Sequence, residues 1–311
     1  MLLAVLPFAG AVNHDFLNWD DQVAIVQNHQ LLAPGVLRWA FTTTLLEHHQ
    51  PMAWLAWAAV ARAAGVVPWA FHAVSLAGHA VNAALVYLLA IQLRPAARTG
   101  WQAAAGPALA ALVFAVHPVH AETVAWVSAL PYVLALAFLL VAALAYVRYT
   151  RSTTTLRRTA WCAAALGSYA VSLLSREYAV AFPLVLLLLD LWVLGRTAPA
   201  ARMLLEKIPF AAAAVCGAAL EWQARTLSSL AELNIGARTQ LMLETPYQYV
   251  ARLLWPQWLS PVYPLPVDGA ANWPLVSLLL LVTVSLAAAA MRLRRTPVVL
   301  CAMLACPLLL A

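Results

Sequence analysis

The chain alternates between long apolar segments and shorter polar ones. About 20 apolar residues cross the hydrocarbon core of a bilayer as an α-helix. The apolar segments from which we predict membrane crossings are 71–93, 106–116, 126–147, 161–174, 179–194, 208–220, 273–290 and 297–311. The pattern therefore predicts an all-α, polytopic transmembrane helix bundle, formed by residues 1–311 as a single membrane domain.

The two ends of the chain are apolar but do not complete a crossing. Residues 1–12 are too few to span a bilayer and lack the charged start of a signal peptide, so we expect the end of a truncated first transmembrane helix. Residues 71–220 are expected to form the core helices. Residues 273–311 are expected to hold the C-terminal helices, the last of them incomplete.

Two longer polar stretches interrupt the apolar pattern. In the first, residues 13–70, aromatic side chains precede a weakly amphipathic segment, 51–67, which we expect to lie on the membrane interface, with a true span as the alternative. The second, 221–272, is rich in aromatic residues and prolines, and within it 247–259 is expected to form another interfacial helix.

Composition supports the membrane assignment. The chain is 64% hydrophobic and 10% charged, with a mean hydropathy of +0.81, against about 25% charged residues in soluble domains. The net charge of +6 is better explained by arginines that set membrane topology than by a nucleic-acid partner. The four cysteines lie in apolar runs without metal or disulfide spacing, so they are interpreted as small core residues.

Charged residues separate onto the two sides of the predicted bundle. The loops after residues 93, 147, 194 and 290 contain 12 of the chain's 18 lysines and arginines, which the positive-inside rule places in the cytoplasm. The opposite, outer side then receives most of the acidic residues. It brings the 13–70 and 221–272 loops to the same face as two polar motifs near residues 120 and 176.

Polar residues also occur inside one predicted crossing. His72, Ser75, His79 and Asn82 are spaced so that they share one face of a helix. They either line a cavity or form hydrogen bonds between helices, and the sequence does not separate these readings.

The outer face carries adjacent carboxylates at Asp20 and Asp21. Two carboxylates beside an apolar slab repel each other, which suits proton transfer, although an ordinary helix cap or solvated loop is the alternative. The segment His117-Pro118-Val119-His120-Ala121-Glu122 is either part of a site or a helix-end turn. Arg176-Glu177 is either a phosphate-binding element or a local ion pair.

These motifs occur in an order that resembles a known family. They are similar to the membrane part of the transmembrane-and-tetratricopeptide-repeat protein O-mannosyltransferases and their bacterial relatives, which are GT-C-fold glycosyltransferases. The matching blocks are Phe16 to Asp21, Gly65 to His72 with Asn82, Phe114 to Val127, Leu174 to Glu177 with Pro183 and Leu186 to Asp190, and Leu254 to Pro256 with Tyr263 to Pro266. This chain has Arg176-Glu177 where the family usually has Lys-Glu, and it contains no tetratricopeptide repeats.

The resemblance implies a GT-C-like bundle that transfers a sugar, best known as mannose, from a polyprenyl-phosphate donor to a hydroxyl acceptor with inversion. Asp20 and Asp21 match the catalytic acidic position. The residues expected to bind the donor or its phosphate are Arg176, His117, His120, Glu122, Glu177 and Arg252, and those that would line the pocket are His72, His79 and Asn82. No metal ligands are assigned, and the residues leave the participation of a divalent cation open.

The expected partners are the lipid-linked sugar, a protein or glycan acceptor, and the bilayer. The alanine-rich, arginine-over-lysine composition favours a bacterial inner membrane, with the site facing the periplasm. The alternative is a degenerate or truncated relative that acts as a non-catalytic scaffold or binds lipid-linked sugars. A transporter is disfavoured, because no inverted repeat is visible.

Overall fold

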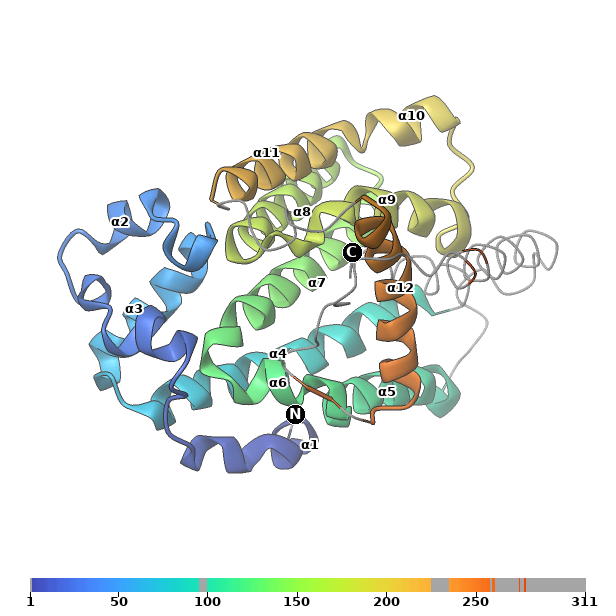
Figure 1. Cartoon of the computed structure of the whole chain (residues 1–311). Coiled ribbons are helices and arrows are strands. Elements are labelled where there is room, and N and C mark those ends of the chain that lie inside the picture. Colours follow the sequence, from blue (N-terminus) through green and yellow to red (C-terminus); the bar gives the residue numbers. More distant parts are fainter. Residues whose placement is uncertain are drawn as a thin grey trace. The chain divides into compact units, whose positions relative to one another are not determined.

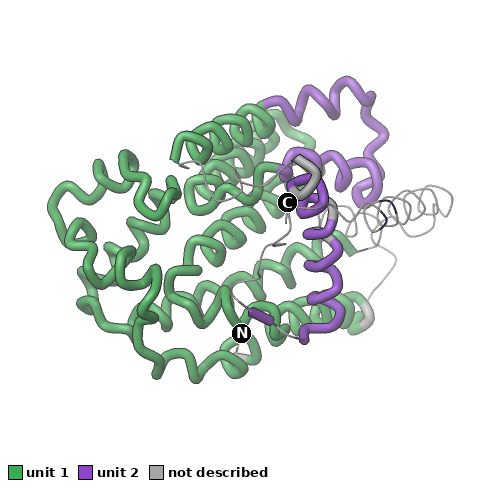
Figure 2. The backbone as a smooth tube through the Cα atoms, viewed as in Figure 1, with its two compact units in different colours: residues 1–180, 209–224 green, residues 181–208, 225–311 purple. Residues whose placement is uncertain are grey.

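The structure is a computed structural model, which describes residues 2–94, 100–224, 235–257 and 259–260, together with positions 274 and 277. These residues form helices and turns and contain no strand. Two compact units are distinguished in Figure 2: residues 1–180 with 209–224, and residues 181–208 with 225–311. Each unit is described by itself below.

The first unit contains most of the long helices (Figure 1). Its N-terminal elements are α1 (Leu2–Val5), η1 (Leu6–Asn13), η2 (Gln22–Val26), η3 (His29–Leu31), α2 (Val36–Thr42), η4 (Leu45–Glu47) and α3 (Pro51–Ala64). There follow α4 (Pro68–Leu93), α5 (Gly100–Val116), η5 (Pro118–His120), α6 (Ala121–Ala125), η6 (Val127–Ala129), α7 (Leu130–Arg151), α8 (Thr155–Ser175), most of η7 (Glu177–Ala181), and α11 (Ile208–Ala224) from residue 209.

Proline and glycine mark where these helices begin and end. Pro51 begins α3 and Pro68 begins α4. Proline is tolerated at this position because the first N–H groups of a helix have no intrahelical acceptor. Gly65 follows α3 with φ of +81°, a conformation that residues with a side chain rarely adopt.

The core of the first unit is built on α7, which packs against α4 and α8, while α4 also packs against α5. Side-chain amides and hydroxyls join the helices: Asn82 Nδ2 donates to the Val133 carbonyl (2.9 Å), and Ser172 Oγ donates to the Ala135 carbonyl (2.7 Å). In an apolar medium such bonds satisfy groups that lipid cannot.

A second part of this core packs against α3. Trp54 and Trp57 are buried there, together with residues of η2, η3, α2 and α4. With 14 residues, α3 is too short to span a bilayer, which removes the alternative of a true crossing for 51–67.

Three helices are long and apolar enough to cross a membrane: Pro68–Leu93, Val127–Arg151 and Ala200–Ala224. A fourth crossing results if Ala103–Val116 and Pro118–Ala125, which meet at a 46° bend, count as one span. Among the described residues, the expectation of membrane-spanning helices is therefore confirmed for these segments by their length and composition.

Two predicted crossings are not in this set. The segment 161–174 is helical within α8, but that helix carries Arg157, Arg158 and several serines. The segment 179–194 is broken into η7, α9 (Phe182–Leu188) and the π-helical η8 (Leu189–Val193), so it does not form one regular helix.

The second unit holds α9, η8, α10 (Ala200–Leu205) and α12 (Ile235–Leu254). Helix α12 begins at Ile235 rather than at residue 247 and ends at Leu254, so within the predicted loop 221–272 the residues 235–254 are helical. Helix formers such as Leu241 and Leu243 occur there together with Arg238 and Glu244, so the segment favours a helix that is too polar to be predicted as a membrane span.

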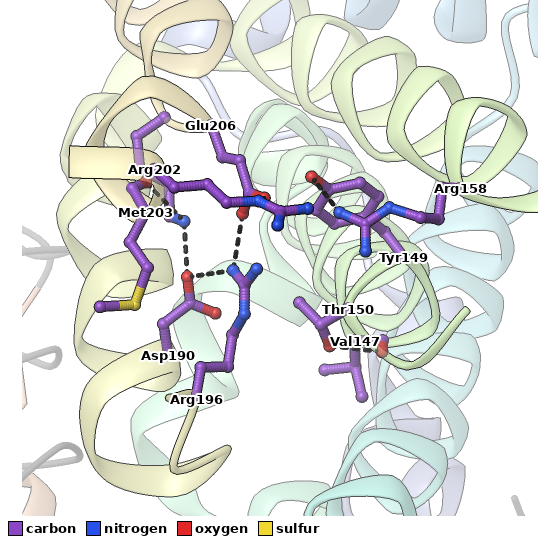
Figure 3. A network of polar contacts seen from close by, with 10 residues as sticks. Val147, Tyr149, Thr150, Arg158, Asp190, Arg196, Arg202, Met203 and Glu206 are labelled. Carbon is purple, nitrogen blue, oxygen red and sulfur yellow. Dashed lines mark hydrogen bonds and ion pairs between the residues drawn. The ribbon is translucent and has the colours of Figure 1, made fainter. Parts of the chain in front are cut away.

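A buried ion network lies within the second unit (Figure 3). Asp190 Oδ2 accepts from Lys207 Nζ at 2.6 Å and from Arg196 at 2.8 Å, and Arg196 also pairs with Glu206 at 2.7 Å. Asp190 is fully buried, so these two cations offset the cost of placing its carboxylate away from water.

The predicted helices 273–290 and 297–311 lie outside the described residues, apart from positions 274 and 277, as do Cys301 and Cys306. Cys216 is exposed on the surface of α11, so the interpretation of the cysteines as core residues is wrong at this position.

Candidate functional site

Asp21 is a buried structural residue. It is the N-cap of η2, and its Oδ2 accepts from the Leu17 N–H at 2.9 Å. Its Oδ1 accepts from the N–H of Ser128, in η6, at 3.1 Å and from the Ser128 hydroxyl. With 1% of its surface exposed, the carboxylate ties the acidic segment to the start of α7.

Asp20 has a different environment from its neighbour. Its side chain is half-buried, and no hydrogen bond to it is formed among the described residues. Burial, followed by the charge of Asp21, raises the pKa of Asp20 above the ordinary value of 3.8. His48 and Arg176 both act to lower the pKa of Asp20, so their side chains lie close enough to affect the carboxylate.

Arg176 is held from several sides. It follows the last residue of α8 in an extended conformation, and its guanidinium donates to Gln50 Oε1 (3.1 Å), the Tyr132 hydroxyl (2.8 Å) and His48 Nε2 (3.1 Å). The same group lies over the Tyr132 ring at 4.6 Å and pairs with Glu177 at 3.5 Å. The local ion pair is therefore only one of its contacts.

His48 connects this arginine to a buried carboxylate. Its Nδ1 lies 2.7 Å from Oε1 of Glu221, and the Glu221 Oε2 accepts from the His49 N–H at 3.2 Å. A guanidinium can only donate, so Nε2 of His48 accepts and the ring proton lies on Nδ1, directed at Glu221. Glu221 is 5% exposed and comes from α11, which touches α8 where Gly217 meets Leu173.

The arrangement also places possible metal ligands together. One ligand atom each from His48, Glu177 and Glu221 lies within 4.8 Å of the other two. These residues come from the segment before α3, from η7 and from α11, so the fold rather than the local sequence assembles them.

The His-Pro-Val-His motif forms a turn at the end of α5. His117 Nδ1 accepts from the Val119 N–H at 3.2 Å, which is the helix-end role expected of the alternative interpretation. The His120 ring lies 4.5 Å from Phe114 and 5.2 Å from His79, whereas Glu122 is exposed on α6. The structure does not join these three side chains to Arg176.

The residues that follow the His-Pro-Val-His motif contact the segment that contains Asp20 and Asp21. Trp126, just after α6, stacks on Trp19 with ring centres 5.3 Å apart. Together with the bonds from Ser128 to Asp21, this stacking fixes residues 17–26 on the segment between α6 and α7.

The polar residues on one face of α4 have two kinds of surroundings. His79 Nε2 lies 3.0 Å from the Ala115 carbonyl, and Asn82 bonds to α7, so these two residues join helices. His72 is buried near the acidic segment, with its ring 6.4 Å from that of His14. Arg252 belongs to the second unit, where it donates to Gln248 Oε1 at 3.1 Å.

Sequence reasoning missed several members of the cluster around Arg176, namely His48, Gln50, Tyr132 and Glu221, and it also missed Ser128, the partner of Asp21. Glu221 carries a usable signal, because it is the only charged residue in α11 and lies at the predicted outer end. His48 and Gln50 precede the proline that begins α3, so they are polar residues at a fixed boundary. Tyr132 has no comparable signal, since an aromatic residue near the start of a membrane helix is common.

No family model matches the chain, and neither curated proteins nor solved structures gave a match. The function therefore has to be inferred from the chain's own residues.

Proposed function

We propose that the protein is an inverting glycosyltransferase that moves a sugar from a polyprenyl-phosphate donor to a hydroxyl acceptor at the outer face of the membrane. The observation that carries this proposal is the placement of Asp20. Its carboxylate has a raised pKa, is not engaged in hydrogen bonds among the described residues, and lies within the electrostatic reach of a rigidly held Arg176.

Asp20 serves as the general base. As the acceptor oxygen attacks the anomeric carbon, its proton passes to the Asp20 carboxylate, and the bond from that carbon to the phosphate oxygen breaks with its electrons moving to the phosphate. A carboxylate with a raised pKa is a stronger proton acceptor than an ordinary one, provided that the working pH keeps it ionised.

Arg176 stabilises the leaving phosphate. A guanidinium can contact two phosphate oxygens at once, and its cation offsets the charge that develops as the bond breaks. Gln50 and Tyr132 hold the guanidinium in place, so little rotamer freedom remains to be lost when the donor binds. Asp21 positions the base through its bonds to Ser128 and Leu17 instead of taking part in proton transfer.

The remaining features of the proposal follow from the sequence. The segregation of basic loops supports an outer-face site, which in a bacterial inner membrane is periplasmic. The acceptor is a protein or glycan hydroxyl, and mannose is the sugar that the family resemblance implies.

The proposal is tested by following the release of polyprenyl phosphate from short-chain polyprenyl-phosphate sugars, with the 311-residue chain in detergent micelles. Asp20→Asn should lower the rate by about 10²–10⁴-fold, the contribution typical of a general base. Asp15→Asn, which alters an exposed carboxylate in the same segment, is the matched control and should leave the rate unchanged.

A folded Asp20→Asn variant with the activity of the unaltered chain would exclude the mechanism. Asp21→Ala should instead lower the thermal unfolding midpoint, because the N–H groups of Leu17 and Ser128 lose their acceptor. Tight binding of the donor with no release by the unaltered chain would favour a non-catalytic protein that binds lipid-linked sugars.

A further inference from the structure

Three side chains from distant parts of the sequence offer metal ligands at one place in the first unit. The relevant atoms of His48, Glu177 and Glu221 lie within 4.8 Å of one another. A divalent ion binds at about 2.0–2.2 Å from each ligand, so His48 Nδ1 and Glu221 Oε1, which are 2.7 Å apart, would have to separate as the ion replaces the proton between them. Binding therefore requires side-chain rotations.

The ligands are already oriented by their neighbours. The His49 N–H holds Glu221 Oε2, which leaves Oε1 facing His48 Nδ1, and Glu221 is almost fully buried. Outer hydrogen bonds of this kind fix the direction of metal-binding carboxylates and add to metal affinity.

Negative charge gathers at this place. Glu177 and Glu221 contribute two negative charges, Asp20 lies within electrostatic reach of His48 and Arg176, and a polyprenyl-phosphate sugar, as a phosphodiester, adds a further negative charge. A divalent cation offsets the repulsion that these carboxylates exert on an arriving phosphate.

We infer that His48, Glu177 and Glu221 bind a divalent cation of the Mn²⁺ or Zn²⁺ class, which receives the donor phosphate together with Arg176. One imidazole and two carboxylates suit these ions better than the all-oxygen coordination that Mg²⁺ and Ca²⁺ prefer. Three protein ligands leave a coordination position for a phosphate oxygen. The inference rests on the proposed function for its role, although the site can be tested without any reaction.

Cation binding would also release Arg176 from His48. The His48 ring donates from Nδ1 and accepts at Nε2 from Arg176. A cation at Nδ1 moves the ring proton to Nε2, which then cannot accept from the guanidinium. Arg176 becomes available to the phosphate when the cation is in place, so cation binding and phosphate binding are coupled.

The test uses the full chain, purified in detergent and freed of metal with a chelator. Manganese binding is measured from the loss of the electron paramagnetic resonance signal of free Mn²⁺, with Zn²⁺ as competitor. Glu221→Gln and His48→Gln should each weaken binding at least tenfold. Glu47→Gln and His49→Gln alter the adjacent carboxylate and imidazole, keep the backbone N–H of His49, and should bind as the unaltered chain does.

Three results would overturn the site: no binding of either ion by the unaltered chain, equal loss in the Glu47 and His49 controls, or no metal-induced rise in its thermal unfolding midpoint. The thermal unfolding midpoint of each variant without metal shows whether that variant is folded. Metal binding without sugar transfer would defeat the proposed function and leave the site standing. Undiminished transfer by the metal-free chain would leave the proposed function standing and overturn the role of the cation in receiving the donor phosphate.

Discussion

At the scale of single residues, Asp20 and Asp21 show how adjacent identical side chains acquire different properties. Asp21 is satisfied by three donors from Leu17 and Ser128, whereas Asp20 is partly desolvated without such donors. The sequence predicts that an acidic pair is present on the outer face. It cannot assign the two roles, because the partner Ser128 lies more than a hundred residues away.

The raised pKa of Asp20 predicts a pH dependence. The rate of transfer at low donor concentration should fall as the pH is lowered through the pKa of Asp20, which lies above 3.8, because only the carboxylate accepts the proton. The charged and titratable groups that act on Asp20 are Asp21, His48 and Arg176, so the apparent pKa belongs to this cluster. A pH–rate profile whose acid limb is unchanged by Asp21→Asn, which removes a neighbouring negative charge, would contradict the assignment.

Stability should respond in the opposite direction to activity. The folded-state pKa of Asp20 is raised, so the folded chain binds this proton more tightly than the unfolded chain, and its carboxylate costs stability once the pH exceeds the unfolded value. Asp20→Asn should therefore unfold at a temperature no lower than the unaltered chain at neutral pH. The difference in unfolding temperature between this variant and the unaltered chain should vanish at a pH below the ordinary pKa range of carboxyl groups.

At the scale of elements, the sequence predicts the helices that are apolar along their whole length. It does not predict the elements whose conformation or burial depends on tertiary contacts. Helix α4 begins at Pro68, three residues before the predicted start at 71, and α7 covers Leu130–Arg151 where the sequence predicts 126–147. The break of 179–194 has a partial signal, because Pro183 lies at the start of α9, but nothing in the apolar sequence predicts the π-helix that follows. The burial of Trp54 in α3 depends on packing against α2 and η3, which periodicity does not reveal.

The contact between α4 and α7 requires a glycine. A Cβ at Gly78 would lie 2.6 Å from Val133 Cγ1, and valine is stiff and here 2% exposed, so it cannot rotate away. Gly78→Ala should lower the free energy of unfolding by about 1–3 kcal/mol, as overpacking does. Thermal and denaturant unfolding in detergent would measure this change.

Gly167→Ala in α8 is the matched control, because nothing lies within 4 Å of its added Cβ. It should be neutral or stabilising by up to about 1 kcal/mol, since alanine favours helix more than glycine does. The double change Gly78→Ala with Val133→Ala should be less harmful than the sum of its parts. Equal effects at positions 78 and 167 would show that the close approach is unimportant.

At the scale of the whole molecule, the distribution of charge anticipated which segments meet. The sequence assigns the 13–70 loop, the residues after α8 and the end of α11 to one face, and the first unit brings His48, Arg176 and Glu221 from these segments into contact. The particular side chains could not be predicted, because their pairing depends on helix rotation and on contacts across up to 173 positions.

The predicted orientation can be tested by labelling. In a chain whose native cysteines are replaced by alanine, His29→Cys and Arg157→Cys place exposed thiols on the predicted outer and cytoplasmic sides. A membrane-impermeant maleimide should label position 29 in right-side-out vesicles and position 157 only after permeabilisation. The reverse pattern would place the candidate site in the cytoplasm.

The stacked indoles of Trp19 and Trp126 give the molecule an optical reporter. Their rings are 5.3 Å apart and inclined by 17°, close enough for their electronic transitions to couple. Such coupling produces paired bands in a circular dichroism spectrum, and a Trp19→Phe change would remove them. Because Trp19 adjoins Asp20, displacement of the acidic segment by a ligand becomes visible in solution without any attached label.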